Sequence, residues 1–176
     1  MQNSDPIWDH VDRHREAFIG LSDRVFDTPE TLYAEHASVA EHKKMLEHYG
    51  FRLTENAAGI PTAVVGEAGD QGPVIAILGE FDALPYLSQE AGVAEHQPIE
   101  DGGNGHGCGH NLLGSAALLA ATAVKEWLEL NGIKGRVRYY GCPAEEGVPR
   151  KPTWCARDSL TMWMLQFHGI RPRSPG

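Results

Sequence analysis

The chain has 176 residues, of which 41% are apolar and 22% are charged, and its formal net charge is −9. This length suits one domain with its own core, and the composition is ordinary for a globular protein. The negative charge argues against nucleic acid or an anionic membrane surface as a partner. No apolar run reaches the ~18 residues of a membrane span, no signal peptide is recognisable, and three cysteines make no disulfide framework. We therefore expect a cytoplasmic protein.

The N-terminal part of the chain predicts two helices followed by two strands. Residues 5–27 carry the apolar stripe of a helix, with a proline in its first turn. A Thr-Pro-Glu sequence ends this helix and starts a second one, which we expect over residues 28–48. Strands are expected at about 51–55 and 61–67, separated by a turn that contains glycine and proline.

The next part of the chain predicts a strand, a long loop, a helix, a second strand and a second loop. Residues 73–79 (PVIAILG) form a continuous apolar run, which is typical of a strand buried on both faces in a largely parallel sheet. The loop at 81–110 is long enough to suggest function or disorder. A strong helix is expected over 111–131 and a strand over 135–142, which leads into the loop at 143–147. This order indicates an α/β protein, in which sites gather at the carboxyl ends of strands.

The first loop ends in the sequence GHGCGHN at residues 105–111. Cys108 and His110 lie two residues apart, so both side chains can point into one site, and thiolate and imidazole are ligands of catalytic zinc. One alternative is that Cys108 is a small buried residue and His110 an N-terminal helix cap. Another is that Cys108 is a nucleophile, which would require a base that does not compete for the same metal.

The second loop carries two adjacent acids, Glu145 and Glu146. Adjacent carboxylates are usually solvated charges, but this pair follows an apolar strand, where both are harder to place in bulk water. Adjacent side chains point in different directions. One can therefore bind a metal while the other acts as the general base on a water molecule.

A third acid, Asp82, follows the predicted strand at 73–79. It can accept a hydrogen bond from the ring nitrogen of His110 that faces away from a metal, and so support the site without binding the ion. The alternative is that Asp82 only caps the turn before Pro85.

Three motifs together resemble a known family. They are GEFDALP at 79–85, GHGCGHNLL at 105–113 and YGCPAEEG at 140–147. In this order they resemble the metal-dependent amidohydrolases and carboxypeptidases that include the aminoacylases, and they look closest to the aminobenzoyl-glutamate branch. The resemblance covers residues 1–147.

The resemblance implies a fold and a set of roles. The fold would be α/β, a truncated N-terminal part of a zinc-peptidase-like (phosphorylase/hydrolase-like) catalytic domain, with a mixed, largely parallel sheet and flanking helices. By position, Cys108, His110 and Glu146 look like metal ligands and Glu145 like the general base. Glu80 stands where many relatives have a ligand histidine. The cofactor would be zinc or manganese, with two ions in full-length relatives, and the thiolate favours zinc.

The resemblance also implies a reaction and missing parts. The substrate would be a small N-acyl amino acid, in which an amide joins an acyl or aroyl group to an amino acid, as in aminobenzoyl-glutamate. Full-length relatives are oligomeric and have a lid and dimerisation domain, which is not recognisable here, so we expect this chain alone to be inactive. Two alternatives are a non-catalytic binding or regulatory remnant of the fold and a cysteine-dependent hydrolase.

Residues 148–176 differ from the rest of the chain. They carry five basic residues and one acidic residue, although the whole chain is strongly acidic. Read in a neighbouring frame with permitted codons, this tail can encode Gly-Leu-Phe-Asp-Asp-Val-Asp and end in Trp-His-Pro, which resembles the family segment with its next ligand histidine. We therefore hypothesise a frameshift between 147 and 150 that makes 148–176 a non-native tail, with His168 an accident of the shifted frame.

Overall fold

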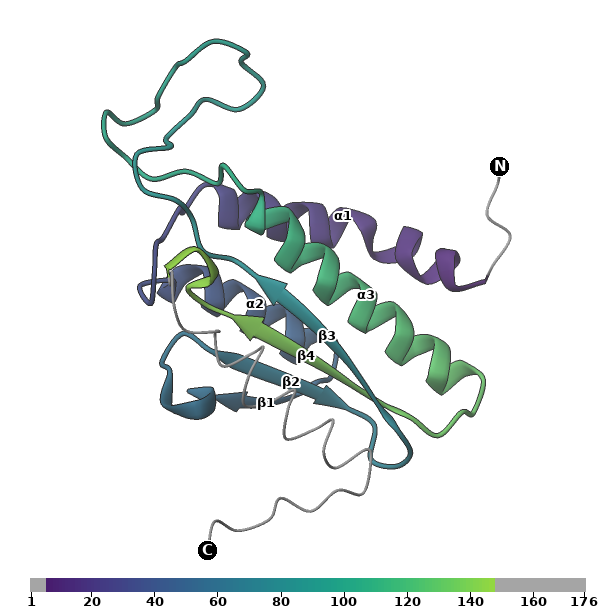
Figure 1. Ribbon diagram of the computed structural model, residues 1–176. Helices are drawn as coiled ribbons and strands as arrows, with labels where there is room; N and C mark the ends of the chain where they lie inside the picture. The colour runs from purple at the N-terminus through teal and green to yellow at the C-terminus, as the bar shows by residue number, and fades with distance from the viewer. Residues whose placement is uncertain (1–5, 148–176) are drawn as a thin grey trace, which may run out of the picture.

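The computed structural model describes residues 6–147. This part of the chain forms a single mixed sheet with flanking helices, so the α/β class expected from the sequence is confirmed (Figure 1). The elements in chain order are α1 (Ile7–Phe26), α2 (His36–His48), β1 (Arg52–Glu55), η1 (Ala57–Gly59), β2 (Val64–Ala68), β3 (Val74–Glu80), α3 (His110–Leu130), β4 (Arg136–Cys142) and η2 (Glu145–Gly147). No helix within residues 6–147 is both long enough and apolar enough to cross a membrane.

The sheet has the strand order β1-β2-β4-β3. The β1–β2 and β2–β4 pairs are antiparallel, whereas β3 and β4 are parallel and are connected through α3. The parallel pairing runs in register up to Glu80 opposite Cys142. The two chain segments that follow β3 and β4 therefore leave the sheet at the same edge, as expected for an α/β site.

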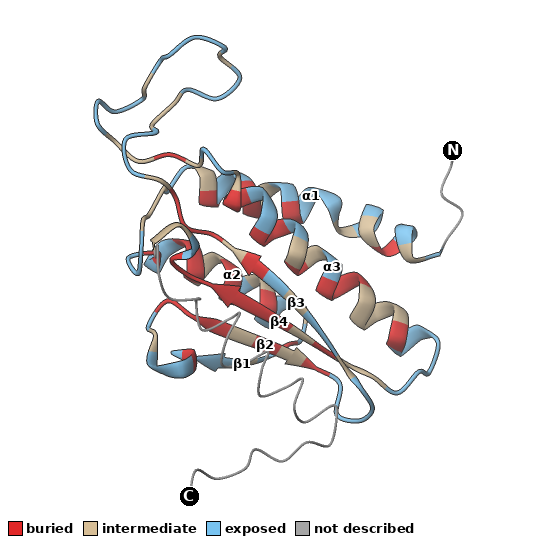
Figure 2. Ribbon diagram, viewed as in Figure 1, coloured by how far each residue is buried: buried red, intermediate tan, exposed pale blue. Residues whose placement is uncertain are grey.

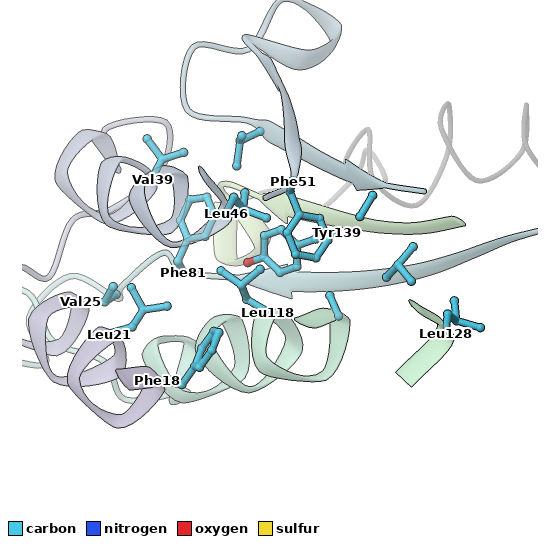
Figure 3. Close-up of a cluster of buried hydrophobic side chains, with 14 residues drawn as sticks. Phe18, Leu21, Val25, Val39, Leu46, Phe51, Phe81, Leu118, Leu128 and Tyr139 are labelled. Carbon is cyan, nitrogen blue, oxygen red and sulfur yellow. The ribbon is translucent and has the colours of Figure 1, made fainter. Parts of the chain in front are cut away.

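Side chains from all three helices share one buried cluster with the sheet (Figure 3). The members of this cluster are Phe18, Leu21, Val25, Val39, Leu46, Phe51, Val64, Ala68, Phe81, Leu118, Ala121, Leu128, Val137 and Tyr139. Tyr139 points into it, while its neighbour Tyr140 packs with Cys142 and Val65 on the other face, because successive strand residues alternate in direction. The helices thus pack against β4, which ends just before residues 143–147, here named the acid loop.

Strand β3 differs from the prediction. We expected it to be buried on both faces, but Gly79 is its only buried residue, and Ile75 and Leu78 are 44% and 36% exposed. Figure 2 shows β3 largely pale blue beside the red β4. The reason is its place in the sheet: among the described strands β3 pairs only with β4, and it lies at the end of the strand order.

The start of the second helix also differs from the prediction. Helix α2 begins at His36 rather than near residue 28, and residues 28–35 form an irregular segment, here named the α1–α2 connection. Within it, Tyr33 adopts a φ of 58°, in the left-handed region that a helix excludes. The side chain of Glu35 is fully buried there instead of facing solvent on a helix. The connection is therefore shaped by tertiary contacts and not by helix propensity.

Candidate metal centre

The candidate site lies where β3 and β4 end beside the first turn of α3. Glu80 is the last residue of β3, His110 is the first residue of α3, and Glu145 begins the short helix after β4. Each of these three residues offers one ligand atom, and the three atoms all lie within 4.8 Å of one another. An imidazole nitrogen with carboxylate oxygens is a ligand set for a catalytic divalent cation, so the residues present fit such an ion.

The distances place His110 at the middle of the acidic groups. Its Nε2 atom lies 3.4 Å from Glu80, 3.9 Å from Glu145 and 3.8 Å from Glu146, measured to the nearer carboxylate oxygens. His110 is buried, whereas the side chain of Glu145 is 45% exposed. The group therefore has a buried nitrogen on one side and an accessible carboxylate on the other.

Asp82 contacts both His110 and the second loop, on the side of the imidazole ring opposite Nε2. One carboxylate oxygen lies 3.0 Å from His110 Nδ1, and the other accepts the backbone N–H of Glu146 at 2.9 Å. When Nδ1 carries the proton and donates to Asp82, the lone pair of Nε2 faces Glu80 and Glu145. One buried carboxylate thus orients the imidazole and also fixes the position of the acid loop.

The pKa values of Glu80, Asp82 and His110 are shifted because these groups lie close together. Burial raises the pKa of Glu80, and the nearby carboxylates of Glu145, Asp82 and Glu146 raise it further, against the opposing effect of His110. The hydrogen bond to Asp82 raises the pKa of His110 in spite of its burial. Burial alone would raise the pKa of Asp82, but its hydrogen bonds from His110 and from the Glu146 N–H lower it overall. Four acids around one imidazole create a negative potential that favours a cation.

A small bridge holds the loop that carries His110. Leu84 and Gly105 exchange two backbone hydrogen bonds of 3.0 Å, which close the base of the long excursion seen at the top of Figure 1. A Cβ on Gly105 would clash with the carbonyl of Leu87, so this close approach requires glycine. Gly109, with a φ of 76°, then turns the chain into α3. This bridge therefore fixes the base of the excursion beside the segment that leads to His110.

Cys108 lies at the rim of the site. It is exposed, so the interpretation of Cys108 as a small buried residue is wrong. A hydrogen bond to the Glu146 side chain is the largest cause that raises the pKa of its thiol. The alternative of a cysteine nucleophile stays a prediction, as does the ligand role of the thiolate. The helix-cap alternative for His110 is also wrong, because Gly109 occupies the N-cap position and the ring of His110 contacts Asp82.

The structure brings most of the predicted residues together. His110 and Glu145 belong to the converging group, and Asp82 makes the contact with His110 Nδ1 that we expected. The ligand roles of Cys108 and Glu146 and the base role of Glu145 stay predictions. The predicted tail at 148–176 lies outside the described residues.

Two features of the site were not expected from the sequence. Glu80 appeared only as a departure from a histidine pattern, yet it lies nearer to His110 Nε2 than the acids of the second loop. The other is the α1–α2 connection, which supports both site loops through three long-range hydrogen bonds. These bonds run from the Ala83 N–H to the Glu30 carbonyl (2.8 Å), from the Asn104 amide to the Pro29 carbonyl (3.0 Å) and from the Ala144 N–H to the Glu35 carboxylate (2.9 Å). The sequence of residues 28–35 gave only a weak signal for this role, because it shows a proline and acidic residues but no apolar periodicity.

Gly114 allows α3 to approach the end of β3. A Cβ at this position would collide with the carbonyl oxygen of Glu80. We expect Gly114→Ala to lower the free energy of unfolding by about 1–3 kcal/mol, because the helix must move away from the strand. Gly20→Ala is the matched helical control, because its Cβ would meet only the flexible end of Arg24, and it should be neutral or stabilising by up to about 1 kcal/mol. Urea unfolding of both variants measures the difference. Equal stabilities for the two would show that the close approach at Gly114 is not required.

Comparison with known proteins agrees with this geometry. Residues 76–171 match peptidase family M20/M25/M40, which is more than half of the chain. Over 154 residues the chain is 49% identical to one of the subunits of p-aminobenzoyl-glutamate hydrolase from Escherichia coli K12, covering 88% of this chain and 32% of that protein. It is 29% identical to the N-acetyl-L-cysteine deacetylase of Bacillus subtilis 168, covering 82% of this chain and 33% of that protein. The chain thus spans about a third of the length of these relatives.

Solved structures give the same result. A dinuclear metal-binding peptidase of the M20 family from Bacillus subtilis, the YXEP protein, superposes with a TM-score of 0.58 at 26% identity, covering 74% of this chain and 36% of that one. A putative aminohydrolase from methicillin-resistant Staphylococcus aureus has a TM-score of 0.64 at 19% identity, covering 80% and 35%, and so supports the fold alone. The family match, the relatives and the described site agree, and the chain belongs to peptidase family M20/M25/M40.

Proposed function

We propose that this chain carries part of the active site of a metal-dependent amidohydrolase, which cleaves the amide bond between an acyl or aroyl group and an amino acid. The observation that carries the proposal is the convergence of Glu80, His110 and Glu145, with Asp82 fixing the imidazole. Family membership supports the reaction type. The relatives named for p-aminobenzoyl-glutamate and N-acetyl-L-cysteine support a substrate with an N-acylated amino acid.

The residues divide the chemical work in a defined way. His110 Nε2, Glu80 and Glu146 would hold a divalent ion, with Cys108 at the rim as a further ligand that favours zinc over manganese. When bound, such an ion supplies Lewis acidity toward the amide carbonyl and toward an attacking water. Glu145 is the accessible carboxylate of the group, so it can take a proton from the water and return it to the leaving amine nitrogen.

The proposal is tested by titrating the 176-residue chain with Co²⁺ and recording visible absorption and heat. We expect binding of at least one ion, reversed by a chelator, because His110 Nε2 lies 3.4 Å from Glu80 and 3.8 Å from Glu146. Affinity should be modest, since the chain spans only about a third of its relatives. A folded chain that binds no Co²⁺ would contradict the proposal and favour a non-catalytic remnant of the fold.

We propose further that the 176 residues alone do not turn over substrate, and that residues 148–176 follow a frameshift. The family match reaches residue 171 and therefore extends past the proposed boundary at 147. Resequencing the gene across codons 140–180 and downstream tests the frameshift. One inserted or deleted base followed by an open frame would support it, and an intact frame would contradict it. Amidase activity of the purified chain that is abolished by Glu145→Gln would contradict the proposed inactivity.

Asp82 provides a graded test of the metal site. We expect Asp82→Ala to weaken Co²⁺ binding by about 10- to 100-fold, because the imidazole loses its orienting partner and the acid loop loses an anchor. Asp82→Asn keeps one acceptor oxygen and should give a smaller loss. Isothermal titration of both variants measures the order. If Asp82→Ala binds Co²⁺ as tightly as the native chain, Asp82 does not support the site.

A further inference from the structure

Glu35 is a fully buried carboxylate that the proposed reaction does not use. It lies in the α1–α2 connection, far in sequence from the site, and its relative exposure is 0%. Its Oε1 atom accepts the backbone N–H of Tyr33 at 3.0 Å and that of Ala144 at 2.9 Å. Burying a carboxylate is costly unless it is hydrogen-bonded, so the two hydrogen bonds to Oε1 help to offset that cost. Burial raises the pKa of Glu35, but Oε1 can accept hydrogen bonds in either protonation state.

The partner of Glu35 is a conformationally unusual residue. Ala144 has a φ of 56°, in the left-handed region that alanine rarely occupies, and it is fully buried. Such a residue persists only where its surroundings enforce it. Ala144 immediately precedes Glu145 and Glu146, whose oxygens lie 3.9 and 3.8 Å from His110 Nε2. The left-handed turn therefore directs the acid pair toward the imidazole.

The acid loop is held at two points. Glu35 accepts the N–H of Ala144 on one side of Glu145, and Asp82 accepts the N–H of Glu146 on the other. An apolar side chain at position 35 could fill the same volume, but it would leave the buried N–H of Ala144 without its acceptor. An acceptor oxygen at position 35 is thus required for hydrogen bonding and not only for packing.

We propose that Glu35 is a positioning residue of the candidate metal centre: it enforces the left-handed turn at Ala144 and so sets Glu145 and Glu146 against His110. The inference deepens the proposed function and rests on it for its chemical meaning. The contact itself is independent of that function, so it can be tested even if no metal binds.

The experiment uses the 176-residue chain with Glu35→Ala and Glu35→Gln. Amide hydrogen exchange at Ala144, followed by NMR, is expected to accelerate by about tenfold or more in Glu35→Ala. Co²⁺ affinity should fall by about 10- to 100-fold. Glu35→Gln retains an acceptor oxygen and should keep Co²⁺ affinity within about threefold of the native value.

A matched control separates positioning from general stability. Glu126 is a partly buried carboxylate that bonds His10 and His14 between α1 and α3, away from the acid loop. Glu126→Ala should destabilise the chain but leave Ala144 exchange and Co²⁺ affinity unchanged at a temperature where all variants are folded. If Glu126→Ala lost as much Co²⁺ affinity as Glu35→Ala, the role of Glu35 would be purely structural and the proposal would be overturned.

Two further outcomes are decisive. If the native chain binds no Co²⁺, the proposed function fails, and Glu35 is then tested by Ala144 exchange alone. Unchanged exchange in Glu35→Ala overturns the inference, and faster exchange supports it.

If Glu35→Ala does not fold, the inference is tested with the native chain and Glu35→Gln. An Ala144 amide that exchanges in the native chain as fast as the backbone amides of the exposed residues 94–96 overturns the inference. A slow native amide together with retained Co²⁺ affinity in Glu35→Gln supports it.

Discussion

Replacing His110 by alanine is expected to weaken Co²⁺ binding by more than about 100-fold, the largest effect of any single substitution in the described site. His110 supplies the one nitrogen of the converging group, and Asp82 already holds its ring in the orientation that exposes Nε2. No reorganisation is then needed when an ion binds, so the loss on truncation should be nearly complete. Visible absorption and titration calorimetry of the Co²⁺ complex measure it.

His96 provides the control for His110→Ala. It is an exposed histidine on the same long loop and is not part of the converging group. His96→Ala should therefore leave the affinity unchanged. Equal loss in the two variants would show that Co²⁺ binds to surface histidines and not at the candidate site. Circular dichroism should confirm that His110→Ala stays folded, although the loss of a charged hydrogen bond costs about 1–3 kcal/mol.

The stability of the chain is expected to fall by about 3 kcal/mol between pH 7 and pH 4 through His42 alone. His42 is fully buried against Phe81 and Tyr139, and burial lowers its pKa from 6.5 to about 4. Below pH 6.5 the unfolded chain binds a proton that the folded chain does not, so acid favours unfolding. This contribution is fully present above pH 6.5 and is lost progressively as the pH falls toward 4.

The variant His42→Phe isolates this effect. Phenylalanine is also a planar aromatic residue but does not titrate, so the unfolding free energy of the variant should vary less between pH 7 and pH 4, by about 3 kcal/mol. Urea unfolding across that range gives both curves. Parallel curves for the native chain and His42→Phe would contradict a buried neutral histidine at this position.

The location of the site could be predicted because it follows from local patterns. The apolar run of β3, the strong helix α3 and the strand β4 together specify a parallel β-α-β unit. The loops after the two strands then lie at one edge, and Asp82, His110 and Glu145 occur in those loops or at the start of the helix. The 3.0 Å contact of Asp82 with His110 follows from this topology.

The burial of a strand and the long-range contacts of a connecting segment could not be predicted from local patterns. The apolar sequence of β3 is compatible with burial on both faces, but exposure depends on which strands lie beside it, and Ile75 is 44% exposed. The prediction of helix in the α1–α2 connection is wrong because this segment is shaped by hydrogen bonds to residues 75 and 109 positions away, and to Ala83. Glu35 bonds Ala144 across 109 positions, and nothing in the residues around Glu35 marks that partner.

The parallel pairing of β3 with β4 also determines where this protein can tolerate changes in length. A strand advances about 3.3 Å per residue, and a slip that keeps the same faces inward needs two residues, which moves one loop by about 6.6 Å relative to the other. That shift exceeds the 4.8 Å within which the three candidate ligand atoms gather. Insertions and deletions inside either strand should therefore be eliminated by selection. The excursion closed off by Leu84 and Gly105 can instead gain or lose residues while the spacing of the site is preserved.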